Sequence, residues 1–167
     1  MLAFRSLLAA AAAALTLAAP AVAQDHPEHI HVHDAYALIG PASGAVFFLI
    51  HNNTENDIRI VGARSELAKK AELHSHTEDA NGVMKMGKIE GGVPLAAGEM
   101  HAFERGGDHV MLMGLTTDLK DGDMIPLTLI FEDGAEIQLD VPVDNARTPD
   151  QATGHSDHDM DHSGMSD

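Results

Sequence analysis

Residues 125–141 read IPLTLIFEDGAEIQLDV, two apolar runs joined by Glu132-Asp133-Gly134. An Asp-Gly pair between two such runs is typical of a tight β-hairpin, because its glycine readily takes the left-handed backbone conformation of the turn. Other stretches also have strand-like patterns, and short polar or Gly-rich turns separate them: residues 30–38, 44–52, 58–64, 71–76, 83–89, 100–104 and 109–115. These short strands, without a convincing helical stripe among them, predict an all-β fold, a Greek-key sandwich or barrel.

The two ends of the chain differ from this β-domain in composition. Residues 1–23 combine the positive Arg5, an apolar stretch and a small-residue cleavage site, which is the pattern of a secretory signal peptide. We therefore expect export to a bacterial periplasm, and no later stretch is long enough to span a bilayer. Residues 24–29 read as a His-bearing arm and residues 30–144 as the domain. Residues 145–167 form an Asp/His/Met-rich tail that we expect to be disordered.

Composition limits the classes of function. The chain has 26 acidic and 10 basic residues, a net charge of −16, which disfavours nucleic acid and anionic lipid as partners. This charge favours cations or a basic protein face, although solubility alone also accounts for it. The absence of cysteine excludes disulfides, thiol chemistry and a blue-copper electron-transfer centre. Ser43 and Ser65 lack a nucleophile-elbow context and no His-Glu-x-x-His motif occurs, so we expect a protein that is not an enzyme.

Histidine and methionine recur two residues apart in the expected strands. In the run GGDHVMLM at 106–113, His109 and Met111 would share one face of a strand. Two further pairs repeat this spacing beside loop-like sequence: His74 with His76, and Met84 with Met86. A lone Met usually packs in a core. Imidazole and thioether donors gathered without a thiolate instead suit copper, in particular Cu(I).

Residues 30–143 resemble the PCu(A)C family of periplasmic copper chaperones. The matching motifs are AELH at 71–74, GVMKM at 82–86 and GGDHVMLMGL at 106–115, with SGAVF at 43–47, HN at 51–52 and IPLTL at 125–129. The resemblance implies a cupredoxin-like Greek-key β-sandwich with copper in an exposed site at one end of the barrel. It also implies binding of Cu(I) and its delivery to the copper centre of cytochrome c oxidase. The expected partner is the copper-bearing oxidase subunit or another periplasmic copper chaperone.

The family motif implies four copper ligands: His74, Met86, His109 and Met111. The family pattern is a His or Met, ten residues, a Met, twenty-one residues and then His-x-Met, whereas this chain has eleven and twenty-two residues in the two gaps. Loop-like sequence in both gaps can absorb one extra residue. The spacing leaves two alternatives open: Met84 for Met86, and His76 for His74. We prefer Met86, because it is the second Met of the GVMKM run, and we expect Met113 to pack in the core.

Two imidazoles and two thioethers are neutral ligands, which suit a soft, monovalent ion. Thioethers carry no proton, so only the histidines would make loading depend on pH. A neutral ligand shell near the surface should release Cu(I) to a thiolate-rich acceptor, which favours a chaperone. The alternative is a periplasmic copper buffer or resistance protein that stores copper without a specific acceptor.

The C-terminal tail contains a second set of candidate ligands. Its Asp and His side chains are harder donors suited to Cu(II), while its Met side chains suit Cu(I). The His and Met residues are His155, His158, Met160, His162 and Met165. We expect the tail to capture Cu(II), with a merely solubilising acidic tail as the alternative.

The N-terminal arm offers a weaker copper site. Cleavage after residue 23 would place His26 third in the mature chain, where its imidazole, the free amine and two backbone amides could hold Cu(II) in a square plane. Cyclisation of Gln24 or a shifted cleavage would remove this arrangement. His29, His31 and His33 have same-face spacing, so they either extend a copper-gathering surface or form an ordinary polar strand edge.

Overall fold

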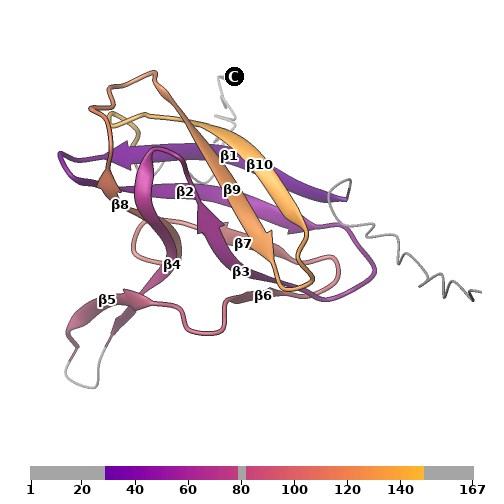
Figure 1. The fold of residues 1–167 in the computed structure, drawn as a ribbon. Coiled ribbons are helices and arrows are strands. Elements are labelled where there is room, and N and C mark those ends of the chain that lie inside the picture. Colours follow the sequence, from indigo (N-terminus) through magenta and orange to yellow (C-terminus); the bar gives the residue numbers. More distant parts are fainter. Residues whose placement is uncertain (1–28, 79–81, 149–167) are drawn as a thin grey trace, which may run out of the picture.

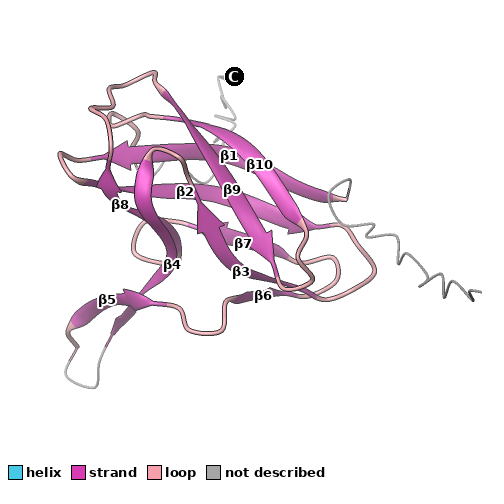
Figure 2. Cartoon of the chain, in the orientation of Figure 1, coloured by secondary structure: helices cyan, strands magenta, loops and turns pink. Residues whose placement is uncertain are grey.

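The computed structural model describes residues 29–78 and 82–148, and Figure 1 traces their path. In Figure 2 these residues form strands joined by loops, and no described segment is a helix that could cross a membrane. The strands are β1 (Ile30–Ile39), β2 (Ser43–Asn52), β3 (Ile58–Arg64), β4 (Ala68–Glu78), β5 (Met84–Lys88), β6 (Val93–Leu95), β7 (Met100–Phe103), β8 (His109–Leu115), β9 (Met124–Phe131) and β10 (Glu136–Pro142).

The strands pair into one sheet that curls into a nearly closed barrel (Figure 1). The order is β1-β2-β8-β4-β3-β9-β10, while β5, β6 and β7 pair with β4, β3 and β2. Strands far apart in sequence are therefore neighbours, since β8 lies between β2 and β4. The ends of the sheet meet where Ala37 bridges Val143, and the Asp144 amide donates to the Ala37 carbonyl at 2.9 Å. The predicted all-β Greek-key architecture is confirmed.

Aliphatic and aromatic side chains fill the inside of the barrel. Phe48 and Ile50 point inward from β2, and the Phe48 ring stacks on Phe103 of β7 with 4.3 Å between centroids. β8 contributes Val110 and Leu112, both fully buried. Because successive strand residues face opposite sides, the β8 residues that alternate with these two face away from the core.

The β9–β10 hairpin forms as its sequence predicts. Gly134 has a φ of 85°, and the Phe131 amide donates to the Ala135 carbonyl at 2.9 Å across the turn. Leu129 of β9 lies opposite Ile137 of β10. The turn residue and the alternation of apolar side chains therefore fix this part of the fold locally.

The sequence pattern does not predict β6, a three-residue strand that contains Pro94. β6 pairs with β3, and its Val93 lies opposite Ile60. The chain approaches β3 so closely that a Cβ on Gly92 would lie 2.3 Å from the Ile60 carbonyl oxygen. So short a strand with a proline leaves little periodicity to detect.

Two further expectations are corrected. β4 extends to Glu78, so residues 77–78 are strand where a loop is predicted, because β5 pairs with this end of β4. The prediction that Met113 packs in the core is wrong, since it lies half-buried on the outward face opposite Ser43 and Lys70. The alternation that turns Leu112 inward turns Met113 outward.

Several predictions concern residues outside the described ranges. They are the signal peptide at 1–23, most of the arm at 24–29 with His26, and the tail beyond residue 148 with its histidines and methionines. These remain expectations from the sequence.

Candidate metal centre

The register of three strands gathers the predicted ligands on one outward face. Alternate residues of β4 share this face, and each lies directly opposite a residue of β8 or β5. Directly opposed residues of antiparallel strands lie on the same side of the sheet. The opposed pairs are Glu72 with Met111, His74 with His109, and His76 with Met86. The hairpin of β4 and β5 projects from the barrel beside this face (Figure 1).

His109 is held with one ring nitrogen free to bind a metal. Its side chain is buried, with only 2% of the residue exposed. Nδ1 lies 3.1 Å from the Gly107 carbonyl oxygen, which can only accept, so Nδ1 carries the proton of the neutral ring. Nε2 therefore presents its lone pair, and the Met86 Sδ lies 3.2 Å away. Nitrogen and sulfur ligands of one tetrahedral ion lie roughly 3.5 Å apart at zinc-like bond lengths. The two donors thus face one another at nearly the separation that a shared ion requires.

The surroundings of His109 favour its neutral form. Burial is the main cause that lowers the pKa of His109 below its ordinary value of 6.5, and the neighbouring His76 and His74 lower it further. The hydrogen bond to Gly107 and the charge of Asp108 oppose this shift. The unprotonated ring is the metal-binding form, so protons compete weakly with a metal at this nitrogen.

A hollow of about 370 Å³ opens beside these donors. Four of the residues that line it are candidate ligands: His76, Met86, His109 and Met111. Phe47 and Leu38 supply apolar side chains to its wall, and Arg105 also lines it. Met86 is 51% exposed, whereas His109 is buried. A metal here would therefore have one anchored nitrogen ligand and one sulfur ligand open to solvent.

The two histidines of β4 differ in their relation to this hollow. The His76 ring centroid lies 5.1 Å from that of His109, and His76 lines the hollow. The His74 centroid lies 6.0 Å from that of His109, and its Nε2 is 3.3 Å from Glu72 Oε2. Nδ1 of both His74 and His76 is buried without a hydrogen-bond partner. Both retain a nitrogen that could bind metal, but only His76 lies with Met86 and Met111 around the hollow.

The sulfur atoms of Met86 and Met111 are the candidate soft donors beside this hollow. Across residues 29–78 and 82–148, no group of three His, Cys, Asp or Glu side chains is arranged to hold a metal ion. Met84, the alternative sulfur donor, is 54% exposed and does not line the hollow. Met86, in contrast, approaches His109 directly.

Two contributors to the site are absent from the sequence-based prediction. Glu72 lies opposite Met111 and contacts His74, and hydrogen bonds from Lys70 and then His74 lower the pKa of this carboxyl. Its position two residues before His74 is a same-face signal that could have revealed it. The carbonyl of Gly107 has no side-chain signal. It accepts from His109 Nδ1 and, at 3.3 Å, from the backbone amide of His76.

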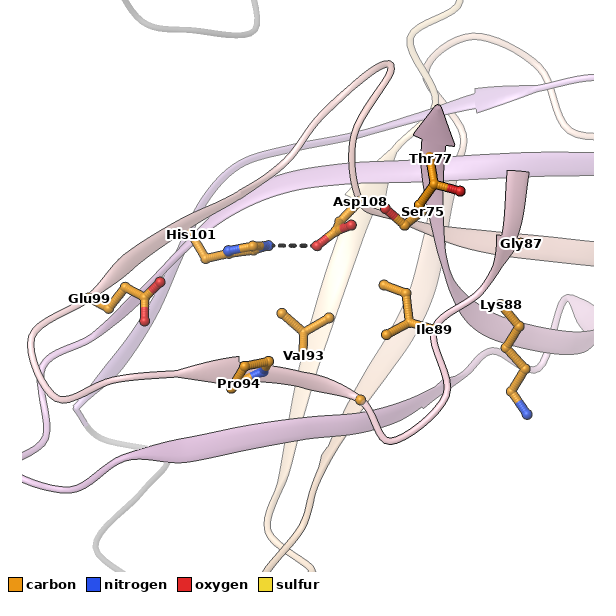
Figure 3. A pocket seen from close by; sticks show the side chains of 11 residues that line it. Ser75, Thr77, Gly87, Lys88, Ile89, Val93, Pro94, Glu99, His101 and Asp108 are labelled. Atoms are coloured by element: carbon orange, nitrogen blue, oxygen red, sulfur yellow. Dashed lines mark hydrogen bonds and ion pairs between the residues drawn. The ribbon is translucent and has the colours of Figure 1, made fainter. Parts of the chain in front are cut away.

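A second hollow, of about 490 Å³, is lined by Ser75 and Thr77 on the other face of β4. Figure 3 shows the side chains that line it. His101 of β7 points at Asp108 across it, with 3.0 Å between Nε2 and Oδ2. Asp108 immediately precedes His109, and it also bridges Phe103 through the backbone. These contacts fix the start of β8, where His109 leaves the Gly106-Gly107 turn.

Comparison with known sequences identifies relatives over the same part of the chain. The model of the family described as "Putative lipoprotein LpqE-like" matches residues 29–143. "Putative lipoprotein Lxx21020" of Leifsonia xyli subsp. xyli (strain CTCB07) is 36% identical over 104 residues, which is 62% of each chain. "Uncharacterized protein RP573" of Rickettsia prowazekii (strain Madrid E) is 27% identical over 104 residues, 62% of this chain and 57% of that one. The match thus spans less than two thirds of these curated relatives.

Solved structures with a similar fold include several PCuAC domains. The apo PCuAC domain from PmoF1 has a TM-score of 0.58 at 22% identity, covering 70% of this chain and 93% of that chain. The copper-bound PCuAC domain from PmoF2 has a TM-score of 0.56 at 18% identity, covering 70% and 92%. Apo-DR1885 from Deinococcus radiodurans has a TM-score of 0.54 at 28% identity, covering 86% and 99%. The resemblance to the PCu(A)C fold is therefore confirmed, and the chain belongs to the LpqE-like family.

Proposed function

We propose that this protein is a copper chaperone that holds Cu(I) on the outward face of β4, β5 and β8. The proposal rests above all on one observation: the unprotonated Nε2 of His109 faces the Sδ of Met86 at 3.2 Å. Met111 lines the same hollow and supplies a second thioether. Neutral nitrogen and thioether donors suit Cu(I) better than harder divalent ions. The copper-bound PCuAC domain from PmoF2, which shares the fold, is consistent with this cargo.

The fourth ligand would come from β4. The family motif maps this ligand onto His74, while the geometry favours the alternative, His76. His76 lies opposite Met86 and lines the hollow, whereas Nε2 of His74 is directed at Glu72. We therefore propose a set of Met86, His109 and Met111 completed by a β4 histidine, with His76 the better placed of the two.

The unequal exposure of the donors favours transfer of the ion. His109 is buried and fixed by its hydrogen bond to Gly107, so it would be the last of the ligands to dissociate from the ion. Met86 is half exposed, so an incoming thiolate could replace this sulfur first. Because the reaction exchanges ligands and forms no new covalent product, the protein would act as a carrier and not as an enzyme. Its acceptor would be the copper-bearing subunit of cytochrome c oxidase or another periplasmic copper chaperone, and its negative charge would favour a basic docking face.

The tail would act beside this site. Arg105, which lines the hollow, donates a hydrogen bond from its Nη2 to the carbonyl of Arg147. The described chain ends one residue later, at Thr148. We propose that the tail captures Cu(II). Export to the periplasm, proposed from residues 1–23, agrees with a relative named as a lipoprotein.

Replacement of Met111 by Leu should lower Cu(I) affinity about tenfold or more, because leucine keeps the volume but removes the soft donor. Met113→Leu is the matched control, since Met113 lies on the same face of β8 without lining the hollow. Competition with a chromophoric Cu(I) chelator measures the affinities. Equal affinities for the two variants would exclude Met111 as a ligand.

The variants His74→Ala and His76→Ala, tested in parallel, identify the β4 ligand as the histidine whose removal causes the larger loss of Cu(I) affinity. A negligible loss of Cu(I) affinity in both variants would contradict a β4 ligand.

A copper-transfer experiment distinguishes the proposed chaperone function from the second candidate function, that of a copper buffer or resistance protein. The Cu(I)-loaded protein, mixed with the soluble copper-bearing domain of a cytochrome oxidase subunit, should lose its ion to that domain. Transfer in the reverse direction should be much slower, and metal analysis of the separated proteins measures both. Retention of copper by the loaded protein would favour storage.

Truncation after Ala152 should remove the capacity for one equivalent of Cu(II) and leave the Cu(I) affinity of the domain unchanged. The reason is that the harder donors lie in the tail and the thioether site lies in the β-domain. Equilibrium dialysis followed by metal analysis measures the stoichiometry in each oxidation state. Unchanged stoichiometry in both states would contradict copper capture by the tail.

The lowered pKa of His109 should make the metal-free protein less stable in mild acid. The unfolded imidazole protonates near its ordinary pKa of 6.5, but the folded one does so only at lower pH. The unfolded state therefore binds more protons as the pH falls below about 6.5, and the free energy of unfolding decreases. Urea unfolding of the wild-type chain and of His109→Gln across this range measures the contribution, which the variant should lack. Parallel pH profiles for the two proteins would show that His109 makes no such contribution.

A further inference from the structure

A row of three further donors crosses the strands β1, β2 and β7. His31 of β1 lies directly opposite His51 of β2, and His51 lies directly opposite Met100 of β7. All three face outward, because their neighbours Ile30 and Ile50 point into the core. The register therefore places two imidazoles and one thioether side by side on the surface, with His51 on the middle strand.

These three side chains are available to a ligand. None of them makes a side-chain hydrogen bond or ion pair with another residue in the described part of the chain. His31 is exposed, His51 is half-buried and Met100 is 58% exposed. Neighbouring strands lie roughly 4.8 Å apart, so an ion above the middle strand is within reach of side chains from both flanking strands. The His33 ring stacks near that of His31, with 6.1 Å between centroids, and adds a third nitrogen donor at the edge of the row.

This row is distinct from the candidate centre beside His109. Both lie along the outward face of β2, where Ala45 is opposite Met111 and His51 is opposite Met100. The His109 ring lies against Phe47 of β2, with 6.0 Å between centroids. Phe47 is four positions from His51, which corresponds to roughly 13 Å along a strand. One ion cannot bridge that distance.

The chemistry of the row favours a soft ion. The carboxylate nearest to Met100 in sequence, Glu99, already accepts a hydrogen bond from the Ala96 amide at 2.6 Å. The row therefore offers imidazole and thioether donors, the set that suits Cu(I). We propose that His31, His51 and Met100 form a second Cu(I) site, which binds independently of the site that contains His109.

The test uses the full chain with its methionine ε-methyl groups labelled with carbon-13 and titrated with Cu(I) under anaerobic conditions. The Met100 methyl resonance should shift on titration, because the adjacent sulfur becomes a ligand. Met124 is the matched internal control, since it is 50% exposed on β9 and lies opposite Pro142 with no histidine beside it. Its resonance should stay in place. The Met100 shift should also persist in a Met86→Leu/Met111→Leu variant, which removes the first site, so failure of the proposed chaperone site would not affect this result.

His51→Gln should abolish the Met100 shift while leaving the shift of Met111 intact. Met100→Leu should reduce bound Cu(I) by one equivalent, and Met124→Leu should not change it. A Met100 resonance that stays unchanged at saturation would overturn the proposal. So would a Met100 shift that disappears in the Met86→Leu/Met111→Leu variant, because it would then report the first site.

Discussion

The pairing of β8 with β2 on one side and β4 on the other is the constraint on which both the fold and the site depend. It turns Val110 and Leu112 into the core and, by strand alternation, turns His109 and Met111 outward. The same seven residues thus stabilise the barrel and carry two donors. A slip of one residue in this register would exchange the two sets, burying polar and sulfur donors while exposing the aliphatic ones. The apolar core therefore fixes the position of the candidate metal ligands.

Rigidity at the site comes from the backbone more than from the ligands themselves. The carbonyl of Gly107 accepts from Nδ1 of His109 and from the amide of His76, so one oxygen connects the two strands that supply the imidazoles. On the other face of β4, the contact between His101 and Asp108 fixes the residue immediately before His109. By contrast, β5 pairs with β4 alone and brings its methionine to the site from outside the barrel. The centre thus joins a fixed nitrogen donor to a more accessible sulfur donor.

The sequence predicts local features of this protein better than long-range ones. The alternation in residues 125–141 with its Asp-Gly turn predicts the β9–β10 hairpin, and the family motifs imply the fold that the comparisons confirm. The choice between His74 and His76 is harder, because both share one face and only the pairing of β4 with β5 shows which lies beside Met86. β6 is too short to leave a pattern, and the role of the Gly107 carbonyl belongs to the backbone. The alignment of His31, His51 and Met100 likewise arises from pairing between distant segments.

The half-exposed sulfur of Met86 makes the candidate site sensitive to oxidants. Conversion of this thioether to methionine sulfoxide would put a polar, hard oxygen where a soft donor is needed, and reductases of the methionine sulfoxide class could reverse the change. Because Met86 lies outside the hydrophobic core, such damage would leave the barrel folded while weakening its hold on a monovalent ion. Under oxidising conditions, sulfoxide formation at Met86 would therefore inactivate the candidate site before the barrel unfolds.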